Sequence, residues 1–188
     1  FGIVSNMAND WLIKDCDFVY AVVAGNDNRP VGIYGMGGNC FVESCQFDDN
    51  GISANVKPIF MASQNTSGKL VIDGNSSVNN VHQFVVVENL LGSADSFDLV
   101  VKNNTTNETS AYILIAGDSN DVINSITVSG NTLSHSHTSA GGGKGIVTFY
   151  GMGDWGKIDL HQDNNTLQDE FFRSGYTLFS QLKDSLGN

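Results

Sequence analysis

Residues 11–18 (WLIKDCDF) decide the fold, because residues 40–47 (CFVESCQF) repeat their alternation of apolar and polar side chains 29 positions later. Further copies of the pattern lie at residues 70–75, 99–104, 126–133 and, more loosely, 158–167. One copy cannot bury its own apolar side, so successive copies are expected to stack as coils of a solenoid.

The position after the bend in each copy carries small or amide side chains, separated by steps of 29, 30, 29, 27 and 34 residues. In order, it holds Cys16, Cys45, Asn75, Asn104, Asn131 and Asn165. Four Asn in one register predict a ladder in which each amide bonds the next coil or the backbone of the bend, where Asn also tolerates a left-handed conformation. The chain has three cysteines, Cys16, Cys40 and Cys45, and their spacing matches no metal site. They are interpreted as small buried thiols, with a disulfide as the minor alternative.

A second apolar strand recurs in each copy. It covers residues 31–34, 59–61, 84–87, 112–115 and 146–150. The tetrapeptide YGMG at residues 34–37 returns at residues 150–153, a shift of 116, which is four times 29. The pattern predicts an all-β, right-handed, single-stranded parallel β-helix with coils of about 29 residues.

Composition limits the partners. Apolar residues make up 40% of the 188 residues and charged residues 15%, and the net charge of −11 reflects 9 basic against 20 acidic side chains. No basic patch and no apolar run of membrane-spanning length is present, so neither nucleic acid nor membrane is an expected partner. The glycines near Lys144 match no phosphate-binding motif, and no cofactor or metal is expected.

The β-helix is expected over residues 1–167, as a fragment of a longer chain, since the first residues show neither an initiator Met nor a signal-type pattern. Residues 168–188 are expected to form a C-terminal cap or the start of another domain. Within them Tyr176, Phe179, Leu182 and Leu186 fall near helical spacing, which predicts a helix.

Coils of variable length, Asn at a bend, and loops of unequal size resemble the pectate-lyase-like right-handed β-helix family. Within that family the acidic, polar chain is most similar to the trimeric tailspikes of bacteriophages. The resemblance implies a homotrimer at the virion tail or outside the cell that binds bacterial surface polysaccharide and degrades it by lyase or hydrolase chemistry. It identifies the fold better than the chemistry, because no catalytic motif of a particular lyase, hydrolase or epimerase matches residue by residue.

Two outward columns follow from alternation along the first strand. The apolar column reads Leu12, Phe41, Val71, Val100, Thr127 and Asp159, and the charged one Lys14, Glu43, Asp73, Lys102, Ser129 and His161. The charged column is interpreted as a solvated ion-pair ladder. The apolar column indicates a covered surface, either a homotrimer interface, or one covered by the chain's own loops or a flanking domain.

Cleavage of a glycosidic bond usually needs two carboxylates roughly 5 to 9.5 Å apart. The leading candidates are Asp118 and Asp154, which follow the second strands of successive coils, with Glu88, Asp48 and Asp49 as alternates. Each taken singly also fits an ordinary turn aspartate or surface carboxylate. The candidates for carbohydrate binding are Trp155, Tyr150, His135 and His137, although the two His also fit a plain polar loop. A lyase would need instead a base near a sugar C5 proton and a group that neutralises the uronate.

Three functions remain open at this level. The first is a glycan-binding, polysaccharide-degrading tailspike. The second is a purely structural shaft or adhesin segment of a virion or cell surface. The third is a monomeric secreted polysaccharide lyase or epimerase.

Overall fold

The computed structural model describes residues 2–6, 10–20, 31–36, 39–48, 57–64, 68–78, 84–91, 97–108, 112–116, 123–135, 145–150, 158–167 and 177–182. Nineteen β-strands occupy these ranges. Within them, no helix has the length and apolar character needed to cross a membrane.

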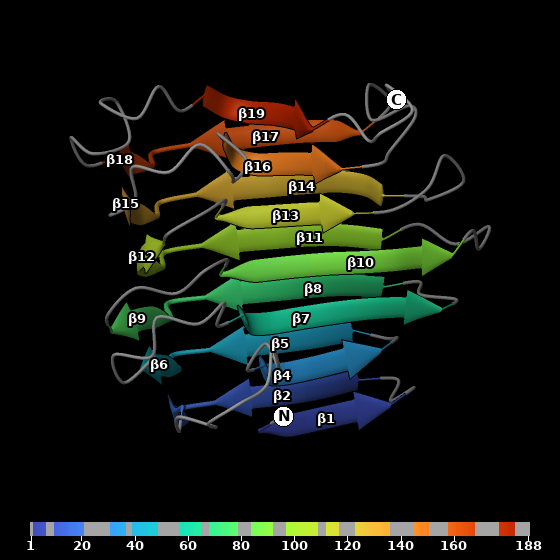
Figure 1. Cartoon of the computed structure of the whole chain (residues 1–188), viewed down its shortest axis with the longest axis vertical. Coiled ribbons are helices and arrows are strands. Elements are labelled where there is room, and N and C mark those ends of the chain that lie inside the picture. The colour runs from blue at the N-terminus through green and yellow to red at the C-terminus, as the bar shows by residue number, and fades with distance from the viewer. Residues whose placement is uncertain are drawn as a thin grey trace, which may run out of the picture.

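The strands build three parallel sheets, and every third strand in the chain belongs to the same sheet (Figure 1). Sheet A contains β1 (Ile3–Asn6), β4 (Val31–Met36), β7 (Lys57–Gln64), β10 (Val85–Leu91), β13 (Ile113–Ala116), β16 (Gly145–Tyr150) and β19 (Thr177–Leu182). Sheet B contains β2 (Asp10–Lys14), β5 (Asn39–Glu43), β8 (Gly68–Asp73), β11 (Phe97–Lys102), β14 (Ile123–Ser129) and β17 (Asp159–Asp163). Sheet C contains β3 (Asp17–Val19), β6 (Gln46–Asp48), β9 (Ser76–Val78), β12 (Thr105–Glu108), β15 (Thr132–His135) and β18 (Thr166–Leu167).

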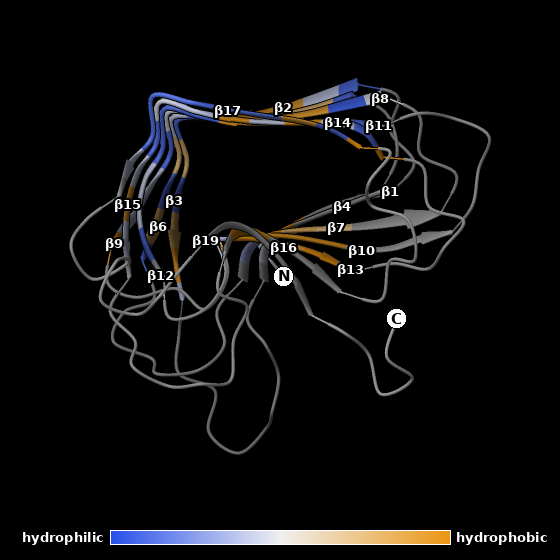
Figure 2. Ribbon diagram, turned by 90° about the horizontal axis from the view of Figure 1, so that it is seen from above, coloured by the Kyte–Doolittle hydropathy of each residue, from blue (hydrophilic) through white to orange (hydrophobic). Residues whose placement is uncertain are grey.

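Seen along the axis, the sheets form three sides of each coil, and the chain runs from sheet A to B to C and back to A (Figure 2). The fold is therefore a right-handed parallel β-helix, as the repeat predicts. The first predicted strand of each copy lies in sheet B and the second in sheet A. Sheet C holds the residues that follow the bend.

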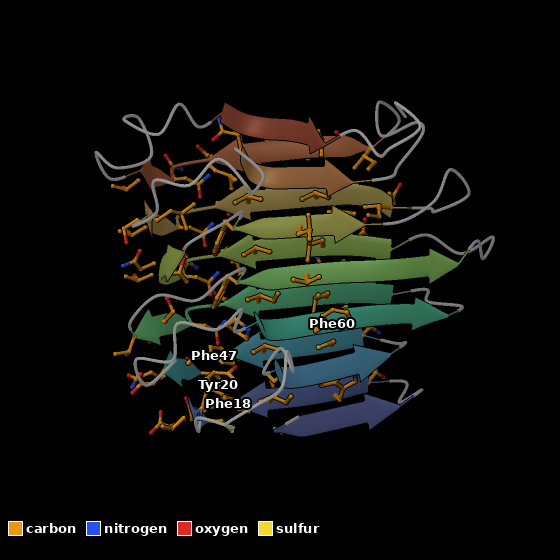
Figure 3. All side chains as sticks on the ribbon, in the orientation of Figure 1. Phe18, Tyr20, Phe47 and Phe60 are labelled. Carbon is orange, nitrogen blue, oxygen red and sulfur yellow. The ribbon has the colours of Figure 1, made fainter. Side chains whose placement is uncertain are left out.

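Apolar side chains of successive coils fill the interior in rows. Val42, Ile72, Val101 and Val128 are fully buried in sheet B, and Ile33, Ile59, Val85, Ile113 and Val147 form the facing row of sheet A. Aromatic rings contact one another along the corner between sheets C and A. Phe18 and Phe47 are stacked with their centroids 4.9 Å apart (Figure 3). Phe84 and Tyr112 are stacked at 5.4 Å, and Phe47 meets Phe84 edge to face at 5.9 Å.

The predicted asparagine ladder is confirmed. Asn104 Oδ1 accepts hydrogen bonds from the backbone N–H and the Nδ2 of Asn75, at 2.8 and 3.0 Å. Asn104 Nδ2 in turn donates to Asn131 Oδ1 at 3.0 Å and to the Ile72 carbonyl at 3.1 Å. Asn165 continues the same pattern in the next coil, where its Oδ1 accepts from the backbone N–H and the Nδ2 of Asn131. Because these amides are buried, each satisfies groups that would otherwise lose their hydrogen bonds with water.

The left-handed residue at the bend is the one before the ladder position, so the expectation that the ladder Asn would adopt this conformation was wrong. The residues at this position have φ between 53° and 65° and are Asp15, Ser44, Gly74, Asn103, Gly130 and Asn164. Their N–H groups donate to the next coil, for example Gly130 N–H to the Asp163 carbonyl at 2.9 Å. The turn at this residue points the following Asn into the core.

The sixth coil is aligned two residues away from its predicted register. Asp159 pairs with Ser125 rather than Thr127, and His161 pairs with Thr127 rather than Ser129. The step from Asn131 to Asn165 is 34 residues long, so this coil contains extra residues. The predicted alignment placed two of them after Asp159, whereas in the structure they precede it. The shift by two keeps every side chain on its predicted face.

The helix expected near Tyr176 was also wrong, because Thr177–Leu182 forms strand β19 and pairs in parallel with β16. Val147 faces Phe179 and Tyr150 faces Leu182 in this pairing. An open edge of sheet A offers a row of backbone donors and acceptors, and pairing with it outweighs a weak helical periodicity. The predicted division at residue 167 stays a prediction.

All three cysteines are free thiols, with Cys40 and Cys45 buried and Cys16 partly exposed. The Cys45 N–H donates to Asn75 Oδ1 at 2.9 Å; its thiol lies 3.3 Å from the Glu43 carbonyl oxygen and makes a long contact of 3.8 Å with the Ile13 carbonyl. An amide at this position would replace that contact with a full hydrogen bond and could accept from the Cys16 N–H.

We therefore expect Cys45→Asn to extend the ladder and to raise the free energy of unfolding by about 1 kcal/mol. Urea denaturation under reducing conditions measures it. The matched control is Cys40→Asn, which buries an amide in the apolar row between Trp11 and Leu70 and should lower stability by about 2 kcal/mol. Equal losses for both variants would contradict the extended ladder.

Candidate functional site

The structure describes some of the predicted site residues in full, some by their backbone alone, and others not at all. Asp118, Asp154, Trp155, Asp49 and His137 lie outside the described residues. Glu88, Tyr150 and His135 lie within β10, β16 and β15, where the backbone alone is described. Asp48 is described in full and is partly buried at the end of β6.

One row of sheet A contains two of the candidates, Glu88 and Tyr150. Glu88 pairs with Ala62 on one side and with Ala116 on the other, and Ala116 pairs with Tyr150. We call these four residues the Glu88–Tyr150 row. Glu88 and Tyr150 are two strands apart, which corresponds to about 9.6 Å between their backbones.

The connections that carry the two leading carboxylates leave from this row. Strand β13 ends at Ala116, two residues before Asp118, and β16 ends at Tyr150, four residues before Asp154. Since β13 and β16 are hydrogen-bonded neighbours, both connections begin side by side at the corner between sheets A and B (Figure 2).

The other candidates lie at a different corner. Asp48 and His135 end strands of sheet C, where the chain turns toward sheet A. Asp48 pairs with Val19 and Val78, and its carbonyl accepts the Tyr20 N–H at 3.0 Å. His135 pairs with Glu108.

The length of a sheet A strand separates the two corners. Glu88 and Ala116 are the fourth residues of β10 and β13, so about 10 Å of strand, at roughly 3.3 Å per residue, lies between their row and the strand starts. Catalytic carboxylates lie roughly 5 to 9.5 Å apart. The strands that precede Asp118 and Asp154 end at one corner, and the strand that precedes Asp49 ends at the other.

Phe60 is a further candidate that sequence reasoning missed. It lies on β7 between the inward-facing Ile59 and Met61, and it is partly exposed on the outer face of sheet A. It precedes Ala62 of the Glu88–Tyr150 row by two residues, on the same face of the strand. Figure 3 shows Phe60 well away from the group formed by Phe18, Tyr20 and Phe47. Alternation between two apolar neighbours was the signal that could have revealed it.

The outer face of sheet B carries the predicted apolar column, which we call the outer stripe: Leu12, Phe41, Val71 and Val100. Leu12 is 60% exposed, whereas Val71 is 9% exposed between its neighbours. Phe41 and Val100 are partly buried. The stripe continues into Thr127 and His161, which are polar.

Ion pairs flank the outer stripe on one side, as predicted. Lys14 Nζ lies 3.3 Å from Glu43 Oε2, and Lys102 Nζ lies 3.0 Å from Asp73 Oδ2. His161 does not belong to this ladder, because it contacts Asp159 of its own strand at 2.9 Å. These groups are exposed, so each pair contributes little to stability.

A third row on the other side of the stripe was not predicted, although it repeats at the same spacing. Asn39 Nδ2 donates to Asp10 Oδ1 at 2.7 Å. Asp98 Oδ1 accepts from Ser125 Oγ at 2.6 Å and from Asn124 Nδ2 at 2.9 Å. These two hydrogen bonds, together with the Lys69 charge, lower the pKa of Asp98. Asp10 and Asp98 thus have partners within the sheet.

Among the side chains that the structure describes, no three His, Cys, Asp or Glu residues converge as ligands for a metal. Three parallel sheets wound in one repeating order around an internal amide ladder define the class of the chain, a parallel β-helix. Comparison with protein-family models, with curated proteins and with solved structures gives no match.

Proposed function

We propose that this chain is the glycan-recognising β-helix of a bacteriophage tailspike, which binds and cleaves polysaccharide on the bacterial surface. The observation that supports the proposal most is the Glu88–Tyr150 row, because the connections to Asp118 and Asp154 begin there on neighbouring strands. In this proposal the protein acts at the virion tail, outside the cell.

The site combines acids with aromatic residues. Asp118 and Asp154 serve as the carboxylate pair, and Glu88 is the alternate from the same corner. Trp155 and Tyr150, and Phe60 on the same face of sheet A as Ala62, supply rings on which sugars stack. His135 and His137 would contact a longer glycan chain at the other corner. The scarcity of basic residues, 9 against 20 acidic ones, favours a hydrolase over a lyase, since a lyase must neutralise a uronate.

The test is incubation of the protein with a panel of capsule and O-antigen polysaccharides, followed by measurement of binding and chain length. We expect shortened chains with a glycan of low charge, and no shortening with Asp118→Asn/Asp154→Asn. The matched control is Asp17→Asn, an exposed carboxylate at the start of β3, away from either corner. Absence of binding and of shortening across the panel would overturn the proposal.

The partner proposed for the outer stripe is a second and a third copy of the chain, as a homotrimer. Leu12, Phe41 and Val100 leave aliphatic and aromatic surface open. In the first four coils of this face, three lysines (14, 69, 102) accompany four carboxylates (10, 43, 73, 98), so the face is nearly neutral on a strongly acidic chain. Copies that meet here avoid much of their mutual repulsion.

We expect Phe41→Lys to convert a trimer into monomers, because it places an unpaired charge at the centre of the outer stripe. Light scattering at micromolar concentration measures the mass. Val19→Lys is the control, since Val19 is 65% exposed on sheet C, outside the stripe, and should leave the trimer intact. A wild-type monomer would favour a secreted lyase or epimerase instead.

The purely structural alternative, a stiff shaft or adhesin segment, is supported by the continuous core and ladder. Under that alternative, Asp118→Asn, Asp154→Asn and Trp155→Ala together leave attachment to the host unchanged. Loss of attachment with these three changes and normal thermal stability would exclude it.

A further inference from the structure

Two thiols occupy the ladder position in the first two coils, at Cys16 and Cys45. Elsewhere along this ladder, side chains of successive coils meet end to end, with Nδ2 to Oδ1 distances of 3.0, 3.0 and 2.9 Å. The coils at Cys16 and Cys45 are stacked in the same way, since the Gln46 N–H donates to the Cys16 carbonyl at 2.9 Å. The position therefore brings successive side-chain ends into contact.

Each sulfur lies near the carbonyl oxygen two residues before it, Cys16 Sγ at 3.2 Å from Lys14 and Cys45 Sγ at 3.3 Å from Glu43. Cys45 Sγ also lies 3.8 Å from the Ile13 carbonyl oxygen of β2, the strand that precedes Cys16. Neighbouring parallel strands are about 4.8 Å apart, which lies within the range of roughly 4.4 to 6.8 Å between Cα atoms that a disulfide spans. Neither backbone has to move far for the two sulfurs to bond.

We propose that Cys16 and Cys45 are a redox pair that forms a disulfide between the first two coils under oxidising conditions. With a small-molecule disulfide as oxidant, the Cys16 thiolate displaces one thiolate and forms a mixed disulfide. The Cys45 thiolate then attacks the Cys16 sulfur and releases the second thiolate. Two protein thiols are oxidised, one small disulfide is reduced to two thiols, and the two protons of the protein thiols pass through solvent to the released thiolates.

The exposure of the three cysteines determines which thiol reacts first with the oxidant. Cys16 is partly exposed and meets the oxidant first, whereas Cys45 is 1% and Cys40 0% exposed. Burial raises the pKa of the Cys45 thiol and of the Cys40 thiol, so neither reacts readily with an external oxidant. Cys40 pairs with Trp11 and Leu70 and has no cysteine beside it in the sheet.

The bond would close one complete coil, from residue 16 to residue 45, into a covalent ring. The two coils are hydrogen-bonded neighbours, β2 with β5 and β3 with β6. The bond ties them together and opposes their separation by local unfolding. The inference does not depend on the proposed function, because it concerns the interior of the fold rather than its loops.

The test is incubation of the purified chain with oxidised glutathione, alkylation of the remaining thiols, and peptide mapping by mass spectrometry. We expect a Cys16–Cys45 crosslink with Cys40 alkylated after unfolding, and a melting temperature higher by roughly 5–10 °C than that of the reduced chain. The control Cys40→Ser should behave in the same way. Cys45→Ala should instead accumulate the glutathione adduct on Cys16, and Cys16→Ser should show no crosslink and no redox-dependent shift.

A crosslink through Cys40, or a wild-type chain that retains the glutathione adduct at Cys16, would overturn the proposal. So would two unreacted thiols after prolonged oxidation of a folded chain. Each result can be obtained whether or not the protein binds a glycan, so the outcome is independent of the polysaccharide assays.

Discussion

Replacing Asn104 by Ala is expected to lower the free energy of unfolding by roughly 3–5 kcal/mol. The substitution removes the acceptor of the Asn75 backbone N–H and the donor to the Ile72 carbonyl, both in the buried interior. It also breaks the contact with Asn131 Oδ1. Water cannot replace these partners in a closed coil, so the full cost of unpaired buried groups remains.

Chemical denaturation followed by circular dichroism measures this loss. Asn124→Ala is the matched control, because it removes the same amide at an exposed site where it donates one hydrogen bond, to Asp98. We expect a change below about 0.5 kcal/mol there. If the two variants were equally stable, the ladder would not contribute to the stability of the fold.

The second large effect is expected for Gly32→Ala, with a loss of about 2–4 kcal/mol. A Cβ at this position would lie 2.6 Å from Tyr20 Oη and 2.9 Å from the Pro58 carbonyl oxygen. The Tyr20 ring is buried and the Pro58 carbonyl is part of β7, so sheet A would have to open between β4 and β7.

The comparison for this variant is Gly74→Ala, measured by the same denaturation. Gly74 has φ of +65°, but the nearest atom to an added Cβ is 3.9 Å away, so only the backbone conformation opposes the change. That cost is about 1 kcal/mol. A smaller loss at Gly32 than at Gly74 would contradict the close approach of the two strands.

The repeat was sufficient to predict the fold because stacked coils place like residues on like residues. The positions of Asn75, Asn104 and Asn131 could be read as a buried ladder from spacing alone. Spacing did not show which residue of the bend is left-handed, since Ser44 and Asp15 occupy that position as readily as Gly130 does. The strand near Phe179 escaped prediction because the apolar spacing from Tyr176 to Leu186 suggested a helix, although Phe179 follows its partner Val147 by 32 residues, close to the repeat.

The candidate site was predicted less well, for a related reason. Asp48 ends one strand and Asp118 comes two residues after another, and the sequence does not say that the first strand belongs to sheet C and the second to sheet A. That difference separates the carboxylates into two sets. The Glu88–Tyr150 row became visible only through the pairing of Glu88 with Ala116, which depends on the register of two coils.

The ladder also makes the coils interchangeable. Its side-chain bonds keep lengths of 2.9 to 3.0 Å while the separation in sequence varies between 27 and 34 residues. Each coil that carries a ladder Asn presents the same donors to one neighbour and the same acceptor to the other, so removal of residues 76–104 would place Asn75 directly on Asn131. Loss or duplication of a whole coil in the gene would therefore change the length of the rod without creating a faulty joint.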